Sequence, residues 1–187
     1  MKTARILACI SWSALLVACS TETPAPLVSD TSTTAATTTA ATAPVNPLLG
    51  VQTLPIAGTP DSEITFSVIS DHFAAEAPLS WSVIGGGVGN GNSLREGVVF
   101  FHYGQPINEP QPLMQEHVVS VELLDESTAK VSYDILNGPR AAGITIPGAA
   151  TFKLNPQGTL DIIENTLPAV ANEAGLQVDV SGLQSAS

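Results

Sequence analysis

Three histidines, His72, His102 and His117, are the side chains with the widest range of chemistry in this sequence. An imidazole can bind a metal ion or exchange a proton near neutral pH. The spacing contains no HxxxH pair and no cysteine follows residue 19, so a zinc site would need distant carboxylates to converge on it. The sequence therefore predicts no metal site and no cofactor, and the histidines are typical of packed or boundary positions.

Asp134 is the candidate for general acid–base chemistry, with His117 or Tyr103 as its partner. An apolar pocket in a curved sheet would raise the pKa of such a carboxylate, as an isomerase-like enzyme requires. Asp134 falls on the polar face of its expected strand, however, and the chain has no G-x-S-x-G motif. We therefore expect a non-enzymatic protein and keep the isomerase-like enzyme as an alternative.

The glycine-rich segment GGGVGNGN at residues 85–92 could contact phosphate through its backbone. It lacks the lysine and hydroxyl residue of a P-loop and the spacing of a dinucleotide-binding motif. It also resembles one calcium-binding nonapeptide, but such repeats work in stacks. The pattern favours a flexible turn.

An aromatic cluster holds most of the aromatic residues of the chain: Phe73, Trp81, Phe100, Phe101 and Tyr103. Such residues usually form a core. If a sheet curves around them, they could instead line an apolar pocket for a lipid or another small hydrophobic molecule. Both interpretations stay open.

Hydrophobic periodicity predicts the elements that position these side chains. A helix is expected over residues 60–76 and another over 166–174, with strands at 79–84, 97–103, 117–124, 128–136, 149–154 and 159–163. The pair 117–124 and 128–136 reads as a hairpin with Ala129, Val131, Tyr133 and Ile135 on one face. This order predicts an α+β domain with a single curved antiparallel sheet and one or two helices.

The segment before Pro78 is ambiguous. Thr59-Pro60-Asp61 is typical of a helix start, yet Ile64, Phe66 and Val68 alternate as in a strand. If this segment and residues 166–174 are strands, the domain is an all-β immunoglobulin-like sandwich.

The N-terminal segment has the pattern of an export signal. Lys2 and Arg5 precede an apolar run that ends at Val17, which is too short to span a bilayer. The residues Leu16-Val17-Ala18-Cys19 resemble the lipobox of bacterial lipoproteins. That resemblance implies cleavage of residues 1–18 and acylation of Cys19, which would anchor the protein to a membrane. Ordinary cleavage near Ala18, which would leave a free thiol, is the alternative.

Residues 19–47 are rich in Thr, Ala and Pro and contain no aromatic residue, so we expect a disordered tether after the lipidated cysteine. Residues 48–187 are long enough for a single globular domain with its own core. The formal net charge of the chain is −11. Nucleic acid is excluded as a partner because its binding needs a basic surface.

The C-terminal half contains short motifs in a suggestive order: Ser127-Thr128-Ala129-Lys130-Val131, Asn137-Gly138-Pro139, Ala150-Thr151-Phe152-Lys153 and Ala174-Gly175. Over about residues 79–175 they resemble the mycobacterial low-molecular-weight secreted antigen family of actinobacteria. The resemblance implies a small exported domain of the cystatin-like or nuclear-transport-factor-like kind, without an assigned enzymatic role. The chain departs from that family at Thr159 and Leu160, where a tryptophan is common, and in its lipid anchor.

Together these features predict a lipoprotein held on the extracytoplasmic face of a bacterial cell membrane. Its partners would be the membrane, through Cys19, and either a small hydrophobic ligand or another envelope protein. A carrier or an isomerase-like enzyme with an apolar pocket is the alternative function.

Overall fold

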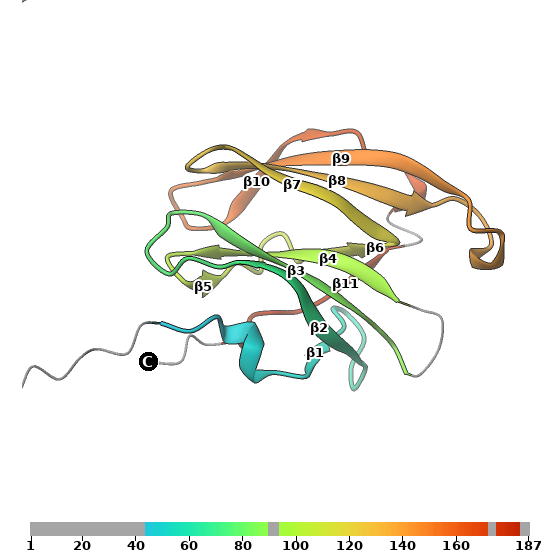
Figure 1. Cartoon of the computed structure of the whole chain (residues 1–187), viewed down its shortest axis with the longest axis horizontal. Coiled ribbons are helices and arrows are strands. Elements are labelled where there is room, and N and C mark those ends of the chain that lie inside the picture. Colours follow the sequence, from blue (N-terminus) through green and yellow to red (C-terminus); the bar gives the residue numbers. More distant parts are fainter. Residues whose placement is uncertain (1–43, 90–93, 172–174, 184–187) are drawn as a thin grey trace, which may run out of the picture. The chain divides into compact units, whose positions relative to one another are not determined.

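The computed structural model describes residues 44–89, 94–171 and 175–183, which belong to one compact unit within residues 41–187. The predicted signal and Cys19 lie outside the described residues. Two antiparallel sheets make up this unit, one of seven strands and one of four (Figure 1). Two short 3-10 turns, η1 (Pro47–Gly50) and η2 (Arg140–Ala142), accompany them among the described residues.

The seven-stranded sheet has the order β1-β2-β3-β4-β6-β11, and β5 pairs with β4. Its strands are β1 (Thr53–Pro55), β2 (Glu63–His72), β3 (Ser80–Gly87), β4 (Arg95–His102), β5 (Gln105–Pro106), β6 (Leu113–Gln115) and β11 (Leu176–Gln177). The four-stranded sheet has the order β10-β9-β8-β7. Its strands are β7 (His117–Asp125), β8 (Thr128–Leu136), β9 (Thr145–Leu154) and β10 (Leu160–Asn165).

The seven-stranded sheet curls until its two ends meet. An isolated bridge pairs Ile56, just after β1, with Val178, just after β11. The Ala57 N–H donates to the Gln177 carbonyl and the Asp179 N–H donates to the Pro55 carbonyl, both at 2.9 Å. These bonds satisfy backbone groups that a sheet edge would leave unpaired.

The curled sheet has apolar side chains on both faces because β4 is buried on both sides. Val99 and Phe101 point into the curl, and Val98 and Phe100 point toward the four-stranded sheet. This explains the continuous apolar run of the sequence at this strand. We call the cluster inside the curl the closed core; its buried members are Leu48, Leu54, Ile64, Phe66, Ile84, Val99, Phe101, Met114, Val178, Val180 and Leu183.

The second cluster, here called the inter-sheet core, lies between the two sheets. Its buried members are Leu79, Val83, Val98, Phe100, Ile107, Val118, Ala129, Val131, Tyr133, Ile135, Leu160 and Ala171. The predicted hairpin supplies one wall of it. β7 and β8 pair as expected, and residues 129, 131, 133 and 135 of β8 are buried while the residues between them are not.

The predicted α+β fold is wrong. Residues 63–72, which we assigned to a helix, form β2 with Ile64 and Phe66 buried in the closed core. The period-two alternation decides this segment because it places β-branched and aromatic side chains on one inward face. The Thr59-Pro60-Asp61 signal forms a turn, in which Asp61 has a φ of 62°.

The all-β alternative predicts the observed type of element, the strand. The four-stranded sheet is a meander, and the seven-stranded sheet runs in sequence order from β1 to β4 before β6 and β11 join it. Neither sheet therefore has the strand order of an immunoglobulin-like sandwich. Of the predicted helix over 166–174, residues 170 and 171 are helical and residues 166–169 are not, while residues 172–174 lie outside the described residues. In the parts of the chain that are described, no helix has the length and apolar character needed to cross a bilayer.

Three glycines of the expected flexible turn, Gly85, Gly86 and Gly87, belong to β3. A Cβ atom at Gly86 would lie only 2.2 Å from the Thr65 carbonyl oxygen. Glycine is therefore needed here for two strands to approach closely. Residues 90–93 of the same segment lie outside the described residues.

The ordered contacts of the domain begin before residue 48. Asn46 is buried, and its Nδ2 donates to Asp71 Oδ1 at 2.8 Å and to Ser82 Oγ at 2.9 Å. The Leu48 N–H in turn donates to Asn46 Oδ1. This network fixes the start of the domain against β2 and β3.

Candidate functional site

An apolar cavity of about 110 Å³ opens between the two sheets. Its walls come from β4, β6 and β11 of the curled sheet, from β8, β9 and β10 of the four-stranded sheet, and from the segment after β5 (Figure 1). The lining residues are Val98, Phe100, Ile107, Pro110, Gln111, Pro112, Leu113, Tyr133, Ala150, Phe152, Leu160, Ile162, Asn165, Leu167 and Gln177. An apolar concavity with a few polar groups is the usual form of a small-molecule site.

The strand register explains why these side chains face one another. On β9, Ala150 and Phe152 lie opposite Val131 and Ala129 of β8, so they share the inward face of the four-stranded sheet. Phe152 reaches across to Phe100 of β4, and the two ring centroids are 5.5 Å apart. This aromatic contact joins the two sheets beside the cavity.

The segment from Ile107 to Pro112 forms one side wall and is held by backbone bonds at several points. The Ile107 N–H donates to the Phe100 carbonyl, and the Leu160 N–H donates to the Glu109 carbonyl, both at 2.8 Å. The Val180 N–H donates to Asn108 Oδ1 at 2.9 Å. The wall is therefore tied to both sheets and to the C-terminal segment.

The chemistry of the cavity is dominated by uncharged groups. Of the described residues that line it, Tyr133 alone has a titratable side chain. Burial raises the pKa of the Tyr133 phenol far above its ordinary value of 10.0, so this side chain stays protonated. The cavity can therefore receive an apolar group, and none of its described lining residues supplies a general base near neutral pH.

The predicted aromatic cluster is dispersed by the fold. Phe100 lines the cavity. Phe73 and Phe101 pack against each other in the closed core, edge to face with centroids 5.1 Å apart. Trp81 lies in a separate groove, and Tyr103 is 56% exposed at a turn.

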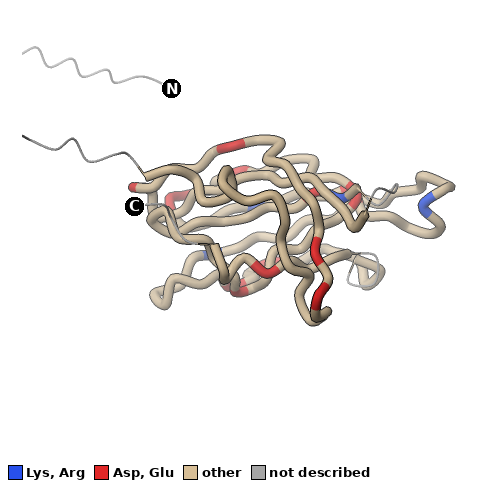
Figure 2. The backbone as a smooth tube through the Cα atoms, turned by 90° about the horizontal axis from the view of Figure 1, so that it is seen from below, with Lys and Arg blue, Asp and Glu red and all other residues tan. Residues whose placement is uncertain are grey.

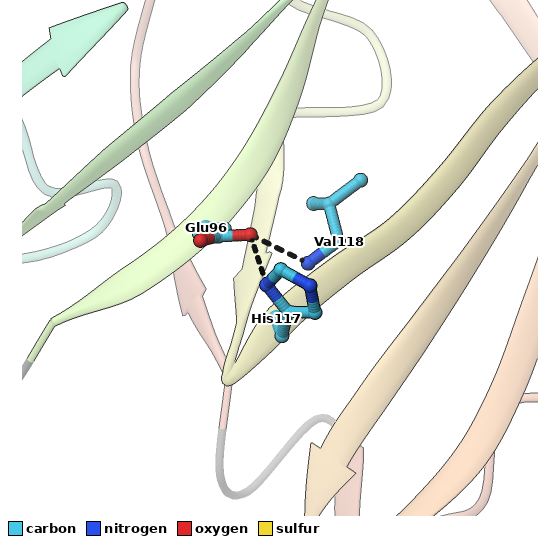
Figure 3. A network of polar contacts seen from close by, with 3 residues as sticks. All are labelled: Glu96, His117 and Val118. Atoms are coloured by element: carbon cyan, nitrogen blue, oxygen red, sulfur yellow. Dashed lines mark hydrogen bonds and ion pairs between the residues drawn. The ribbon is translucent and has the colours of Figure 1, made fainter. Parts of the chain in front are cut away.

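That separate groove lies between β2, β3 and β4 on one side and β7 on the other, and has a volume of about 220 Å³. Trp81 stacks on His72 there with centroids 4.7 Å apart. Glu96 Oε2 lies 2.5 Å from His117 Nδ1 and accepts the Val118 N–H at 2.9 Å, which links the two sheets (Figure 3).

The candidates for acid–base chemistry do not meet in the apolar cavity. Asp134 faces away from the inter-sheet core, directly opposite His117 on β7. His102 Nδ1 lies 2.7 Å from the Pro78 carbonyl oxygen. Within the described residues, no group of three or more His, Cys, Asp or Glu side chains is arranged to hold a metal ion.

Most residues that line the cavity are not among the predicted site residues, although the sequence predicts the strands that carry some of them. The inward face of β8 was recognised, and it includes Tyr133. Phe152 and Leu160 lie in the two strands predicted at 149–154 and 159–163. The turn between these strands is closed by the Gly158 N–H, which donates to the Asn155 carbonyl at 3.0 Å. The wall from Ile107 to Pro112 reads only as a loop, because its contacts are with residues far away in the sequence.

A model of the LppP/LprE lipoprotein family matches residues 71–157. This match supports a bacterial lipoprotein. No curated protein and no solved structure matches the chain significantly.

The matched range runs from β2 to the turn after β9, and it contains ten of the lining residues, from Val98 to Phe152. The family match also supports a membrane-anchored location in the cell envelope. The resemblance of residues 79–175 to the mycobacterial secreted antigens is not confirmed by these comparisons.

Proposed function

We propose that this lipoprotein is anchored through an acylated Cys19 on the extracytoplasmic face of the membrane, and that its domain is a non-enzymatic binding module. It takes the apolar part of a small molecule into the cavity between its sheets. The single observation that supports this most is the apolar lining shared by both sheets, with polar side chains confined to a few positions. The family match supports the lipoprotein class. The inference about the ligand rests on the lining of the cavity.

The size of the cavity sets the size of the apolar group. An engineered apolar cavity of about 150 Å³ stays dry and binds benzene. A cavity of about 110 Å³ therefore suits one small ring or a short alkyl segment. Burial of that group would gain roughly 25 cal/mol per Å² of apolar surface removed from water.

The non-enzymatic part of the proposal is supported by the titratable groups. A proton-transfer enzyme needs a group whose protonation changes near neutral pH and lies within reach of the substrate. Tyr133, the titratable side chain among the described lining residues, stays protonated. A binding role needs no such change.

Native mass spectrometry tests the binding role. The chain would carry Cys19→Ser, so that any extra apolar mass is bound non-covalently, and it would be measured before and after organic extraction. We expect a bound species that extraction removes. A bare polypeptide mass in both samples would contradict the proposal and favour contact with another envelope protein.

A pair of neighbouring alanines provides the matched variants. Ala150 lines the cavity, and Ala149 lies on the opposite face of β9, opposite Ser132. Ala150→Leu would fill part of the cavity and should reduce the bound fraction. Ala149→Leu adds the same atoms outside the cavity and should leave the bound fraction unchanged.

A further inference from the structure

We infer that the ligand is electrically neutral where it meets the cavity mouth and presents an oxygen acceptor there, as an alcohol or an ester does. This inference rests on the proposed function and adds the chemical class of the polar end. The lining residues range from fully buried to exposed, and we take the buried ones as the inner end of the cavity and the exposed ones as its mouth.

The inner end is formed by side chains that the sheets bury. Val98, Phe100, Tyr133 and Ala150 each expose 5% or less of their surface. At the other extreme, the lining residues Asn165, Gln177 and Ile162 are exposed. The third polar residue, Gln111, is half-buried. A bound molecule would therefore place its apolar part inward and its polar end among these amides.

The amide of Asn165 has a defined orientation. Its Oδ1 accepts a hydrogen bond from the Leu167 N–H at 2.8 Å, so this oxygen is already bonded to the backbone. The group that Asn165 can offer a ligand is its Nδ2, which is a donor. A ligand oxygen with a lone pair, as in a hydroxyl, an ether or an ester carbonyl, matches this donor.

The lack of charged side chains among the described lining residues argues against an ionised ligand. None of the described lining residues is charged. Acidic positions are spread over the described backbone and basic ones are few, as Figure 2 shows, and the chain has a formal net charge of −11. Among the described lining residues, a carboxylate would find no cation to replace its lost hydration, and an ammonium would find no carboxylate.

Three matched probes test this class: hexan-1-ol, hexanoate and hexylammonium. They share one alkyl chain and differ only in the polar end. Each would be titrated into the Cys19→Ser chain at pH 7, with amide chemical shifts of the lining residues as the readout. We expect hexan-1-ol to bind about tenfold more tightly than hexanoate, and more tightly than hexylammonium.

A charge placed at the mouth sharpens the test. Gln177→Lys adds a cation at an exposed lining position and should strengthen hexanoate binding about threefold, as expected for an exposed ion pair. Gln157→Lys makes the same change in the turn between β9 and β10, away from the lining. It should leave hexanoate binding unchanged.

The outcomes separate the two levels of the proposal. Equal binding of hexanoate and hexan-1-ol by the unaltered mouth would overturn the inferred class while supporting a binding cavity. An equal gain in the two lysine variants would also overturn it, because the mouth would then not be where the polar end lies. Failure of all three probes to bind would contradict the binding function itself, and the inferred class with it.

Discussion

The closed core and the inter-sheet core are built from the same kinds of residue but are filled differently. Inside the curl, Ile64, Phe101 and Met114 expose none of their surface, and the bridge between Ile56 and Val178 seals the circle of strands. Between the sheets, an aromatic contact and buried aliphatic residues leave a cavity at one side and a groove at the other.

This difference assigns the two regions different tasks. A cluster buried inside a closed sheet removes apolar surface from water and therefore stabilises the fold. An apolar space between two sheets loses packing contacts, and a ligand can restore them. The closed core thus supports the fold, and the inter-sheet core supplies the proposed binding site.

Truncating the closed core should have the largest effect. Phe101→Ala removes a fully buried ring that also contacts Phe73, so unfolding free energy should fall by about 3–5 kcal/mol. Urea denaturation measures it. Tyr103→Ala, at an exposed aromatic residue two positions along, is the control and should change stability far less. Equal losses for both variants would contradict the assigned roles.

Adding volume should distinguish the two cores directly. Ile84→Phe in the closed core should cost about 1–3 kcal/mol, because Ile84 is fully buried and a larger side chain must displace its neighbours. Ala150→Leu should cost less than about 1 kcal/mol, since its added atoms enter the cavity. Thermal or urea unfolding gives both values. A larger loss for Ala150→Leu would show that the inter-sheet space is as full as the closed core.

Alkaline pH should weaken the inter-sheet core through Tyr133. Burial raises the pKa of this phenol above the unfolded value of 10.0. The contribution of the protonated phenol to the free energy of unfolding is therefore complete below pH 10. Above pH 10 this free energy falls by up to about 1.4 kcal/mol per pH unit. Unfolding measured from pH 8 to 11 should show a shallower decline for Tyr133→Phe.

The matched control for that pH dependence is Tyr103→Phe, at an exposed tyrosine. It should keep the steep decline of the unaltered protein. If Tyr133→Phe and the unaltered protein decline with the same slope, then the phenol of Tyr133 is not protected by the inter-sheet core.

The link between the sheets at the groove should have the smallest effect. Glu96→Gln weakens the contact with His117 but keeps an acceptor for the Val118 N–H, so stability should fall by at most about 1 kcal/mol. Denaturation in low and high salt would check this, with the difference from the unaltered protein shrinking in high salt. A loss comparable to that of Phe101→Ala would contradict the ranking.

Local patterns were sufficient for much of the four-stranded sheet. The alternation from Ala129 to Ile135 fixes the buried face of β8, and Asn155 with Gly158 marks the turn to β10. These signals arise from residues that are close in sequence. The two-residue period of the sequence predicts which side chains of β8 are buried, because one face of this strand contacts the inter-sheet core and the other does not.

The curled sheet could not be inferred in the same way. A helix start at Thr59-Pro60-Asp61 precedes the strand alternation of the segment Glu63–His72, and the pairing with β1 and β3 decides for the strand. The contact between Ile56 and Val178 joins segments at opposite ends of the domain. Local periodicity contains no information on such a closure. The presence of two separate cores, and of a cavity between the sheets, could therefore not be predicted from the sequence.

Benzene binding, followed residue by residue with amide chemical shifts, tests the central claim most directly. The account predicts saturable shifts at Val98, Phe100, Tyr133 and Phe152 around the cavity and none at Ile64 in the closed core. Shifts that centre on the closed core, or no saturable shift at either core, would contradict the claim that the inter-sheet cavity is the binding site.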